Sequence, residues 1–426
     1  MNDWRTRSII LALVASLAVV ACGDDDEDNG DNNQTNNNQV DPVEPFDDDC
    51  TNTLQPMEDS EATTDAIDAA LLEVQSGDVV CLVDGDYEMT RGVSLTVDDV
   101  EIRGESQQGV VLDFSEQSGG SSGIDVENAD NFTIRHLSVH NTAGDGIQVR
   151  NGDGVHFDGI DVIWDSESDS NNGDYGLYPV MSQNIIIENS YVFGASDAGI
   201  YLGQSEDGII RGNVVEGNVA GLEVENSSRI DVYDNVATDN SAGILIFNLP
   251  ELERKEGDTV RAFDNQVTDN NRANFSGESA GIISLVPAGS GFLIVGVQDV
   301  RVYDNEIIDH KSIGVGAVSF DSLPQSYEDD EYNPNAELID VFDNVIDEAG
   351  YDPEALAAQL IDFEPIPHVV WDGVFDDEVD LEDRQNCFSG NVDSDGEPAT
   401  YGNMATESME LDDVDCSLDE LPAVEL

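Results

Sequence analysis

The segment VAGLEVENSSRIDVYDNVATDN, residues 219–240, is one copy of a pattern that recurs along most of the chain. Apolar and polar residues alternate in it, and turn-forming Asn, Asp and Ser separate the alternating runs. Such runs are typical of short β-strands with one buried side. The residues that we expect to face the interior are Leu222, Val224, Ile230, Val232 and Val236. Those that we expect on the outside are Glu223, Asp231 and Tyr233.

The same pattern repeats before and after this segment. Its first strand opens on a glycine and an aliphatic residue, at Gly123, Gly146, Gly176, Gly199, Gly221 and Gly243, with spacings of 23, 30, 23, 22 and 22 residues. One unit of three short strands is too small to bury its apolar side, so successive units must stack. The chain lacks the Leu/Asn consensus of leucine-rich repeats, and its unit is too short for a propeller blade. We therefore expect an all-β, right-handed, single-stranded parallel β-helix.

Asparagine recurs at one corner of the predicted coil, and helical segments flank the coils. The corner residues are Asn189, Asn213, Asn235, Asn265, Asn305, Asn344 and Asn391, which predicts a hydrogen-bonded ladder. Residues 61–78 have helical spacing and predict an N-terminal capping helix that begins at Thr64 or Asp65 and ends at Gly77. A second helix is expected over residues 352–363, and the longer spacing after Phe247 predicts long loops on the later coils.

The N-terminus has the features of an export signal. Residues 1–21 combine two early arginines, an apolar run and small residues before Cys22, and the run is too short to span a membrane. The end of this segment resembles a bacterial lipobox, which implies lipidation of Cys22 and, since Gly23 follows, an outer-membrane or cell-surface location. Residues 22–49 are acidic and rich in Asn, which predicts a disordered tether. The β-helix domain with its C-terminal cap is then expected over residues 50–426.

Cysteine content and charge limit the chemistry of the exported domain. Cys50, Cys81, Cys387 and Cys416 allow three pairings; we favour Cys50–Cys81 and Cys387–Cys416, because each would fasten one end of the domain, over four free thiols. The chain has 15 Lys and Arg against 92 Asp and Glu, a net charge of −77. Such a surface repels phosphate backbones, which excludes nucleic-acid binding, and it attracts Ca²⁺ as a candidate cofactor.

Five blocks of sequence resemble an exported bacterial family of parallel β-helix repeat proteins. These are NGDYGLYPVMSQNIIIENS, SDAGIYLGQS, VAGLEVENS, DNVATDNSAGILIFNLP and VVWDG, and the resemblance spans most of residues 65–374. It implies a secreted protein or lipoprotein anchored to the membrane through its lipid alone. It also implies a partner, since genes of this family tend to lie beside one for an exported cytochrome-like protein.

The chain is more distantly similar to pectate lyases and alginate C5-epimerases. The epimerases carry an Asp-Pro-His-Asp motif, and this chain has YGLYPVM at residues 175–181. Tyr178, Val180 and Met181 stand where that motif has Asp, His and Asp, so the catalytic histidine is replaced. Lyases of this shape use Lys or Arg as a base together with Ca²⁺; the lysines of this chain are Lys255 and Lys311.

Stacking the coils on their glycines places a set of polar residues on one outer surface. The candidate ligand-binding residues are Tyr175, Tyr178, Tyr201 and Gln204, because tyrosine rings cover sugar C–H surfaces and amides pair with hydroxyls. The candidate catalytic acids are Asp174, Asp197 and Glu223, of which Asp174 and Asp197 are also candidate Ca²⁺ ligands. Outward ladders of Tyr, Asp and Asn also arise in solenoids for turn chemistry and stacking alone.

Three histidines form a further candidate metal site. His136 and His140 alternate with Leu137 and Val139, and His156 recurs one coil later. No cysteine accompanies these histidines, and no third ligand follows them at the spacing of a known metal site.

Two kinds of function are compatible with these features. The first is a surface-anchored β-helix lipoprotein that binds extracellular polysaccharide or a protein partner without catalysis. The second is a Ca²⁺-dependent polysaccharide lyase or C5-epimerase acting on an extracellular glycan.

Overall fold

The computed structural model describes residues 46–277, 280–375, 385–411 and 414–426, which belong to one compact unit, Val43–Leu426. The expected signal peptide, Cys22 and most of the tether lie outside the described residues and stay predictions. Among the described residues, no helix has both the length and the apolar character that crossing a membrane requires.

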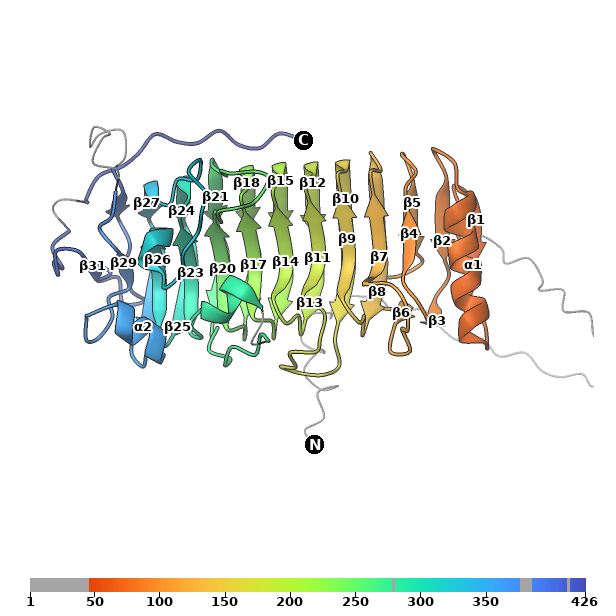
Figure 1. The fold of residues 1–426 in the computed structure, drawn as a ribbon, viewed down its shortest axis with the longest axis horizontal. Helices are drawn as coiled ribbons and strands as arrows, with labels where there is room; N and C mark the ends of the chain where they lie inside the picture. Colours follow the sequence, from red (N-terminus) through yellow and green to blue (C-terminus); the bar gives the residue numbers. More distant parts are fainter. Residues whose placement is uncertain (1–45, 278–279, 376–384, 412–413) are drawn as a thin grey trace, which may run out of the picture. The chain divides into compact units, whose positions relative to one another are not determined.

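The strands form a column with three faces, and all named strands that pair do so in parallel (Figure 1). The first face is an 11-stranded sheet. Its strands are β4 (Val93–Leu95), β7 (Ser122–Glu127), β9 (Asp145–Arg150), β11 (Tyr175–Val180), β14 (Ala198–Gly203), β17 (Ala220–Glu225), β20 (Ala242–Phe247), β23 (Ser290–Val295), β26 (Ile313–Val318), β29 (Val369–Trp371) and β31 (Tyr401–Asn403).

The other two faces join into one 20-stranded sheet, because the long strands β8 (Phe132–His140) and β10 (Asp153–Ile163) run through both. The second face adds β1 (Asn52–Leu54), β2 (Val79–Leu82), β5 (Glu101–Gly104), β12 (Gln183–Glu188), β15 (Glu206–Arg211), β18 (Ser228–Tyr233), β21 (Val260–Phe263), β24 (Gln298–Tyr303), β27 (Glu337–Phe342) and β30 (Cys387–Ser389). The third face adds β3 (Gly85–Glu88), β6 (Val110–Asp113), β13 (Tyr191–Phe193), β16 (Val214–Glu216), β19 (Val236–Thr238), β22 (Gln266–Thr268), β25 (Glu306–His310) and β28 (Val345–Ala349).

Aliphatic side chains from all three faces fill the column, which confirms the predicted parallel β-helix. Leu222, Val224, Ile230 and Val232 are buried in this core, as the alternation predicts. The prediction for Val236 is wrong: it is half-exposed, and Ala237 is the buried residue of β19. The turn before β19 breaks the alternation, since Asp234 has a left-handed backbone with φ of 56°.

Two asparagine ladders, rather than one, run along corners of the column. In the predicted ladder, the side-chain amide of each asparagine from Asn213 to Asn344 donates to the side-chain oxygen of the next, at 2.9–3.0 Å. Asn189 is not a member, because Ser190 occupies the ladder position. The Ser190 hydroxyl oxygen accepts from the backbone N–H of Ile160, and the backbone N–H of Ser190 donates to Asn213 Oδ1. The second ladder is Asn218, Asn240, Asn270 and His310.

The two ends of the column are covered differently. Helix α1 (Ser60–Glu73) covers the first coils, and α2 (Ala355–Leu360) lies near the last ones (Figure 1). The predicted start of α1 is wrong: Asp59 is the N-cap, its side chain accepting from Ala62 N, and Thr64 instead donates to Ser60 O within the helix. Disulfides join Cys50 to Cys81 and Cys387 to Cys416, the pairs that we favour.

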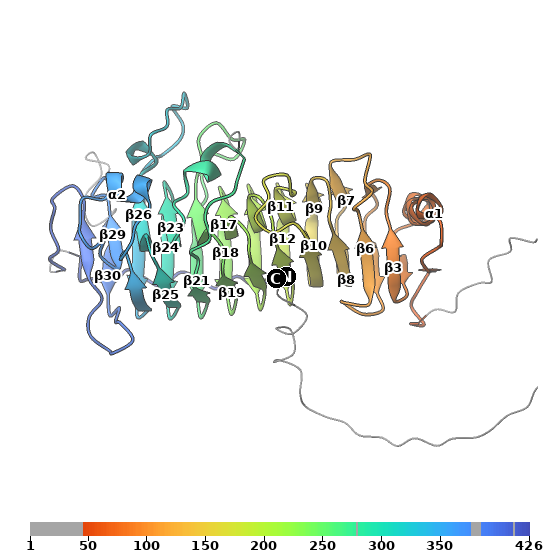
Figure 2. The ribbon, with the colours of Figure 1, turned by 90° about the horizontal axis from the view of Figure 1, so that it is seen from below.

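Loops and a C-terminal strap cover parts of the outer surface. The loop between β22 and β23 carries the short 3₁₀ helix η2 (Gly281–Leu285), and that between β26 and β27 carries η3 (Phe320–Ser322). In Figure 2 these loops rise on the side of the column that carries the first face. Residues 417–426 run along the second face: Leu418 N donates to Asp340 Oδ2, Arg301 Nη2 to Asp419 O, and Val424 N to Asp231 Oδ2.

Deleting residues 417–426 should lower the free energy of unfolding by about 2–4 kcal/mol. The deletion removes hydrogen bonds to charged groups, each of which contributes roughly 1.5–3 kcal/mol net. The conformational entropy that ordering residues 417–426 costs offsets part of this contribution. Denaturant titration of the variant and the full chain measures the difference. Deleting only residues 425–426, which follow the contact of Val424, is the control and should change little. Equal unfolding midpoints for all three chains would show that the strap adds no stability.

Candidate functional site

Three tyrosines form a cluster on the outer side of the first face. Tyr175 and Tyr178 come from β11 and Tyr201 from β14, and the three ring centroids are 4.5–4.9 Å apart. Ala198 is the register partner of Tyr175, and its small side chain leaves room for the Tyr175 ring to lean toward Tyr201. The parallel register therefore converts positions 23 residues apart into direct neighbours.

Four carboxyl groups lie among these rings. Asp197 Oδ2 accepts a hydrogen bond of 3.1 Å from the Tyr175 hydroxyl, and Glu225 Oε1 accepts one of 2.8 Å from the Tyr201 hydroxyl. Asp145 Oδ1 accepts from the backbone N–H of Tyr175. Glu223 is the register partner of Tyr201 and is 3 % exposed. We call these seven residues the tyrosine–carboxyl cluster: Asp145, Tyr175, Tyr178, Asp197, Tyr201, Glu223 and Glu225.

Burial raises the pKa values of all four acids of the cluster. It raises the pKa of Asp145 to about 7 and that of Glu225 to about 7. The pKa values of Asp197 and Glu223 are raised well above the ordinary range. Burial is the largest cause, and the negative charge of neighbouring acids adds to it. A carboxyl group that holds a proton can donate as well as accept a hydrogen bond. Raised pKa values of this kind concentrate at functional sites.

Covering loops close one side of the cluster and leave the other accessible. Asn226 fastens the loop after β20, since its side-chain amide donates to Leu249 O and Arg254 O while its oxygen accepts from Leu249 N. Apolar residues of the next loop, including Ile283, pack in the same apolar layer as Tyr201. Tyr201, Glu223 and Glu225 are therefore buried, whereas the side of the cluster nearest β9 and β11 is only half-buried.

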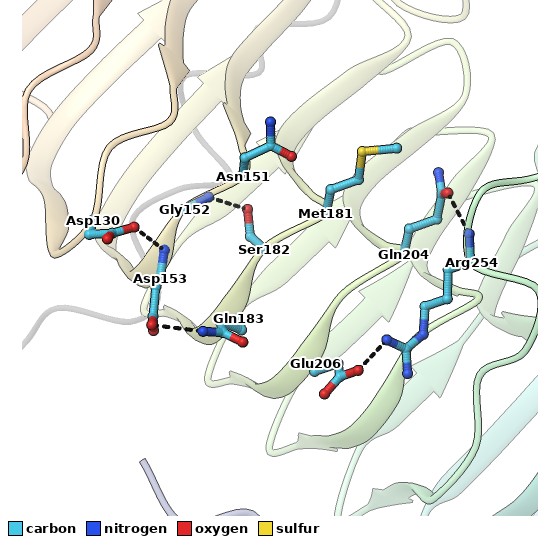
Figure 3. Close-up of a pocket in the computed structure, with 10 residues that line it drawn as sticks. All are labelled: Asp130, Asn151, Gly152, Asp153, Met181, Ser182, Gln183, Gln204, Glu206 and Arg254. Atoms are coloured by element: carbon cyan, nitrogen blue, oxygen red, sulfur yellow. Dashed lines mark hydrogen bonds and ion pairs between the residues drawn. The ribbon is translucent and has the colours of Figure 1, made fainter.

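A polar cavity of about 440 Å³ lies at the end of the neighbouring strands (Figure 3). Its lining residues are Asp130, Asn151, Gly152, Asp153, Met181, Ser182, Gln183, Gln204, Glu206 and Arg254. Gln204 Oε1 accepts from Arg254 N, and the Arg254 guanidinium pairs with Glu206. Met181 lines this cavity and also packs in the apolar layer of the tyrosines, so the cavity and the cluster adjoin.

The structure brings together most, but not all, of the residues that the sequence analysis selects. Tyr175, Tyr178, Tyr201, Asp197 and Glu223 meet in the cluster. Gln204 instead lines the adjoining cavity, at the turn that ends β14.

Asp174 lies at the rim of the cluster. Its side chain is exposed and accepts from Ser196 Oγ, while its backbone oxygen accepts from Asp197 N. A Ca²⁺ site at Asp174 and Asp197 stays a prediction.

Two acids of the cluster, Asp145 and Glu225, are absent from the sequence-based selection. Asp145 precedes Gly146 in its repeat and Glu225 is the second outward residue of its strand, so the aligned glycines contained the signal. The repeat pattern alone does not show that Glu225 is buried or that Asp145 accepts from the backbone N–H of Tyr175, one coil later.

Comparisons with known proteins match the family described as "Right handed beta helix region" over residues 88–249 and 122–294. Among solved structures, the Azotobacter vinelandii mannuronan C-5 epimerase AlgE4 A-module is 16 % identical, with 82 % of this chain and 96 % of that chain covered and a TM-score of 0.45. A polygalacturonase from Erwinia carotovora ssp. carotovora is 15 % identical, with 72 % and 94 % covered and a TM-score of 0.46. A search of curated protein sequences gives no significant match.

Proposed function

Since this chain is a right-handed parallel β-helix protein, we propose that it binds an extracellular glycan at the tyrosine–carboxyl cluster, as a lipid-anchored protein of the cell envelope. The observation that carries the proposal is the mutual contact of three tyrosine rings, two of which donate their hydroxyls to Asp197 and Glu225. Tyrosine faces cover sugar C–H surfaces, while hydroxyl and protonated carboxyl groups pair with sugar hydroxyls. The signal-like residues 1–22 support the location.

The charge of the site favours a neutral glycan over a polyuronate. The chain has a net charge of −77, and the acids of the cluster raise one another's pKa values. Bringing a polyanion to this surface costs free energy unless salt or a divalent cation screens the repulsion. We therefore expect neutral glycans to bind more tightly than alginate or pectate when Ca²⁺ is chelated.

Replacing Tyr178 by Ala should lower the affinity for a bound neutral glycan by about 10-fold or more, because truncating an aromatic side chain at the centre of a binding site costs about 2 kcal/mol or more. Isothermal titration calorimetry with a panel of neutral glycans, alginate and pectin measures the affinities. Tyr351→Ala is the matched control, since Tyr351 is 55 % exposed and bonds to Asp309 outside the cluster. Binding of no glycan, or equal affinities for both variants and the parent chain, would contradict the proposal.

Acid–base chemistry on the bound glycan is the second candidate function. The pKa values of about 7 for Asp145 and Glu225 support it, because a general acid or base works best with a pKa near the working pH. The lysines do not support a lysine base, since Lys255 pairs with Asp329 and Lys311 Nζ lies 3.8 Å from Glu354. Assays for new reducing ends and for unsaturated products, with and without a chelator, test this function. We expect Asp197→Asn to abolish product formation if the reaction occurs at the cluster.

The exported cytochrome-like protein remains a proposed partner, which co-purification from the native envelope would test.

A further inference from the structure

A second group of chemically active side chains lies on a different face of the column. His156 and Asp158 of β10 and Glu188 of β12 each present one ligand atom, and these atoms lie within 4.8 Å of one another. His156 Nε2 is 2.9 Å from Glu188 Oε1. The three residues come from adjacent coils of the second face, where Asp158 is the register partner of Glu188. They share no residue with the tyrosine–carboxyl cluster.

The hydrogen bonds around these carboxylates leave one oxygen of each directed toward the histidines. Arg211 Nη2 holds Glu188 Oε2 at 2.6 Å, while Glu188 Oε1 meets His156. The Asn189 side-chain amide holds Asp158 Oδ1 at 2.8 Å. Outer contacts of this kind orient metal ligands in known sites.

A second histidine lies beside this group. His136 Nε2 is 3.9 Å from Asp158 Oδ2, the oxygen that Asn189 leaves free. A Cβ atom placed on Gly159 would come within 3.1 Å of His136 Cδ2, so the glycine leaves the space that the His136 ring occupies. His140, which the sequence analysis groups with these histidines, lies instead at the end of β8 on the third face, paired in register with Asp113.

We propose that His156, Asp158 and Glu188 bind a divalent transition-metal ion of the Zn²⁺ class, with His136 next to the open coordination position. Imidazole nitrogen together with carboxylate oxygen is a donor set that suits Zn²⁺ and its neighbours, whereas Ca²⁺ and Mg²⁺ prefer oxygen alone. The side chains of His156, Asp158 and Glu188 are 33 %, 21 % and 16 % exposed, so an ion can reach them from solvent without a change in fold. The strong negative charge of the chain would raise the local concentration of any cation.

The test uses the chain stripped with a chelator and then titrated with Co²⁺ and Zn²⁺ in millimolar Mg²⁺, which saturates non-specific acidic sites. We expect one saturable Co²⁺ ion with visible absorption bands that report nitrogen ligation, displaced by Zn²⁺. His156→Gln should weaken binding by at least about 100-fold, and Asn189→Gly, which removes an outer contact, by about 10-fold. Zn²⁺ should raise the melting temperature of the parent chain but not of His156→Gln.

His368→Gln is the matched control, since His368 lies near the other end of the column and contacts Thr400. We expect this variant to bind Co²⁺ like the parent chain. The melting temperature of metal-free His156→Gln should equal that of the metal-free parent, which shows that any loss of binding is not a loss of fold. Identical Co²⁺ spectra for the parent and His156→Gln, or spectra of oxygen-only coordination, would overturn the proposal.

Discussion

Replacing Glu225 by Gln should raise the free energy of unfolding at pH 8 by about 3 kcal/mol. The folded chain raises the pKa of Glu225 from its ordinary 4.5 to about 7, because the side chain is 8 % exposed. Each unit of such a difference corresponds to about 1.4 kcal/mol. The folded state then binds a proton more tightly than the unfolded state, so its stability falls as the pH rises from about 4.5 to about 7. Glutamine keeps an oxygen for the Tyr201 hydroxyl and carries no charge to bury.

Urea titrations of both chains at pH 4 and pH 8 measure this effect. The two chains should be almost equally stable at pH 4, where Glu225 is protonated in both states, and should diverge at pH 8. Glu167→Gln is the control for the change in net charge, since Glu167 is exposed, and it should change stability little at either pH. A difference that is the same at both pH values would show that burial of the charge is not its cause.

A gain in stability from Glu225→Gln would also bear on function. A protein that keeps a destabilising acid in a covered position loses stability that a neutral residue would provide. Such a position is expected where binding or catalysis needs the acid.

Replacing Asn265 by Ala should lower the free energy of unfolding by about 4 kcal/mol or more. The Asn265 amide donates to Val232 O and to Asn305 Oδ1, both at 2.9 Å. Its oxygen accepts from the backbone N–H and the side-chain amide of Asn235. Alanine would leave these buried groups without partners, and each unsatisfied group costs roughly 1–3 kcal/mol. Coils on both sides of position 265 would be affected, because the ladder connects them.

Denaturant titration again gives the measurement, with Asn171→Ala as the control. Asn171 is exposed and contacts only Asp169 among the hydrogen bonds of the described residues, so its replacement should cost less than about 0.5 kcal/mol. A loss for Asn265→Ala as small as that for the control would mean that the ladder contributes little to stability. The coils would then depend on their aliphatic core alone.

The fold was predictable because it follows from local and repeated features. The spacing of the glycines and the alternation around Leu222 and Ile230 indicated a stacked coil, and the corner asparagines indicated the ladder. The ends of individual helices and strands, and the residues buried next to turns, were less predictable. Asp234 in a left-handed turn shifted the buried residue of β19 from Val236 to Ala237, and Asp59 rather than Thr64 began α1. Both depend on single backbone conformations, which residue patterns specify weakly.

The candidate site was only partly predictable. Placing Tyr178 beside Tyr201 required nothing more than the register of the repeat, which the glycines set. Selecting Glu225 required knowing that this outward side chain is buried and accepts from the Tyr201 hydroxyl. Grouping His156 with Glu188, 32 residues later, required the register of β10 with β12, in which Asp158 lies opposite Glu188.

The sequence by itself determined a parallel column with an aliphatic interior, because period-two alternation and a regular repeat constrain every coil in the same way. The tertiary structure alone decided which outward acids are buried, and therefore which of 92 acidic residues have raised pKa values. The physical reason is that a pKa depends on the solvent lost around a side chain. That loss comes from irregular loops, whose paths the repeat does not encode.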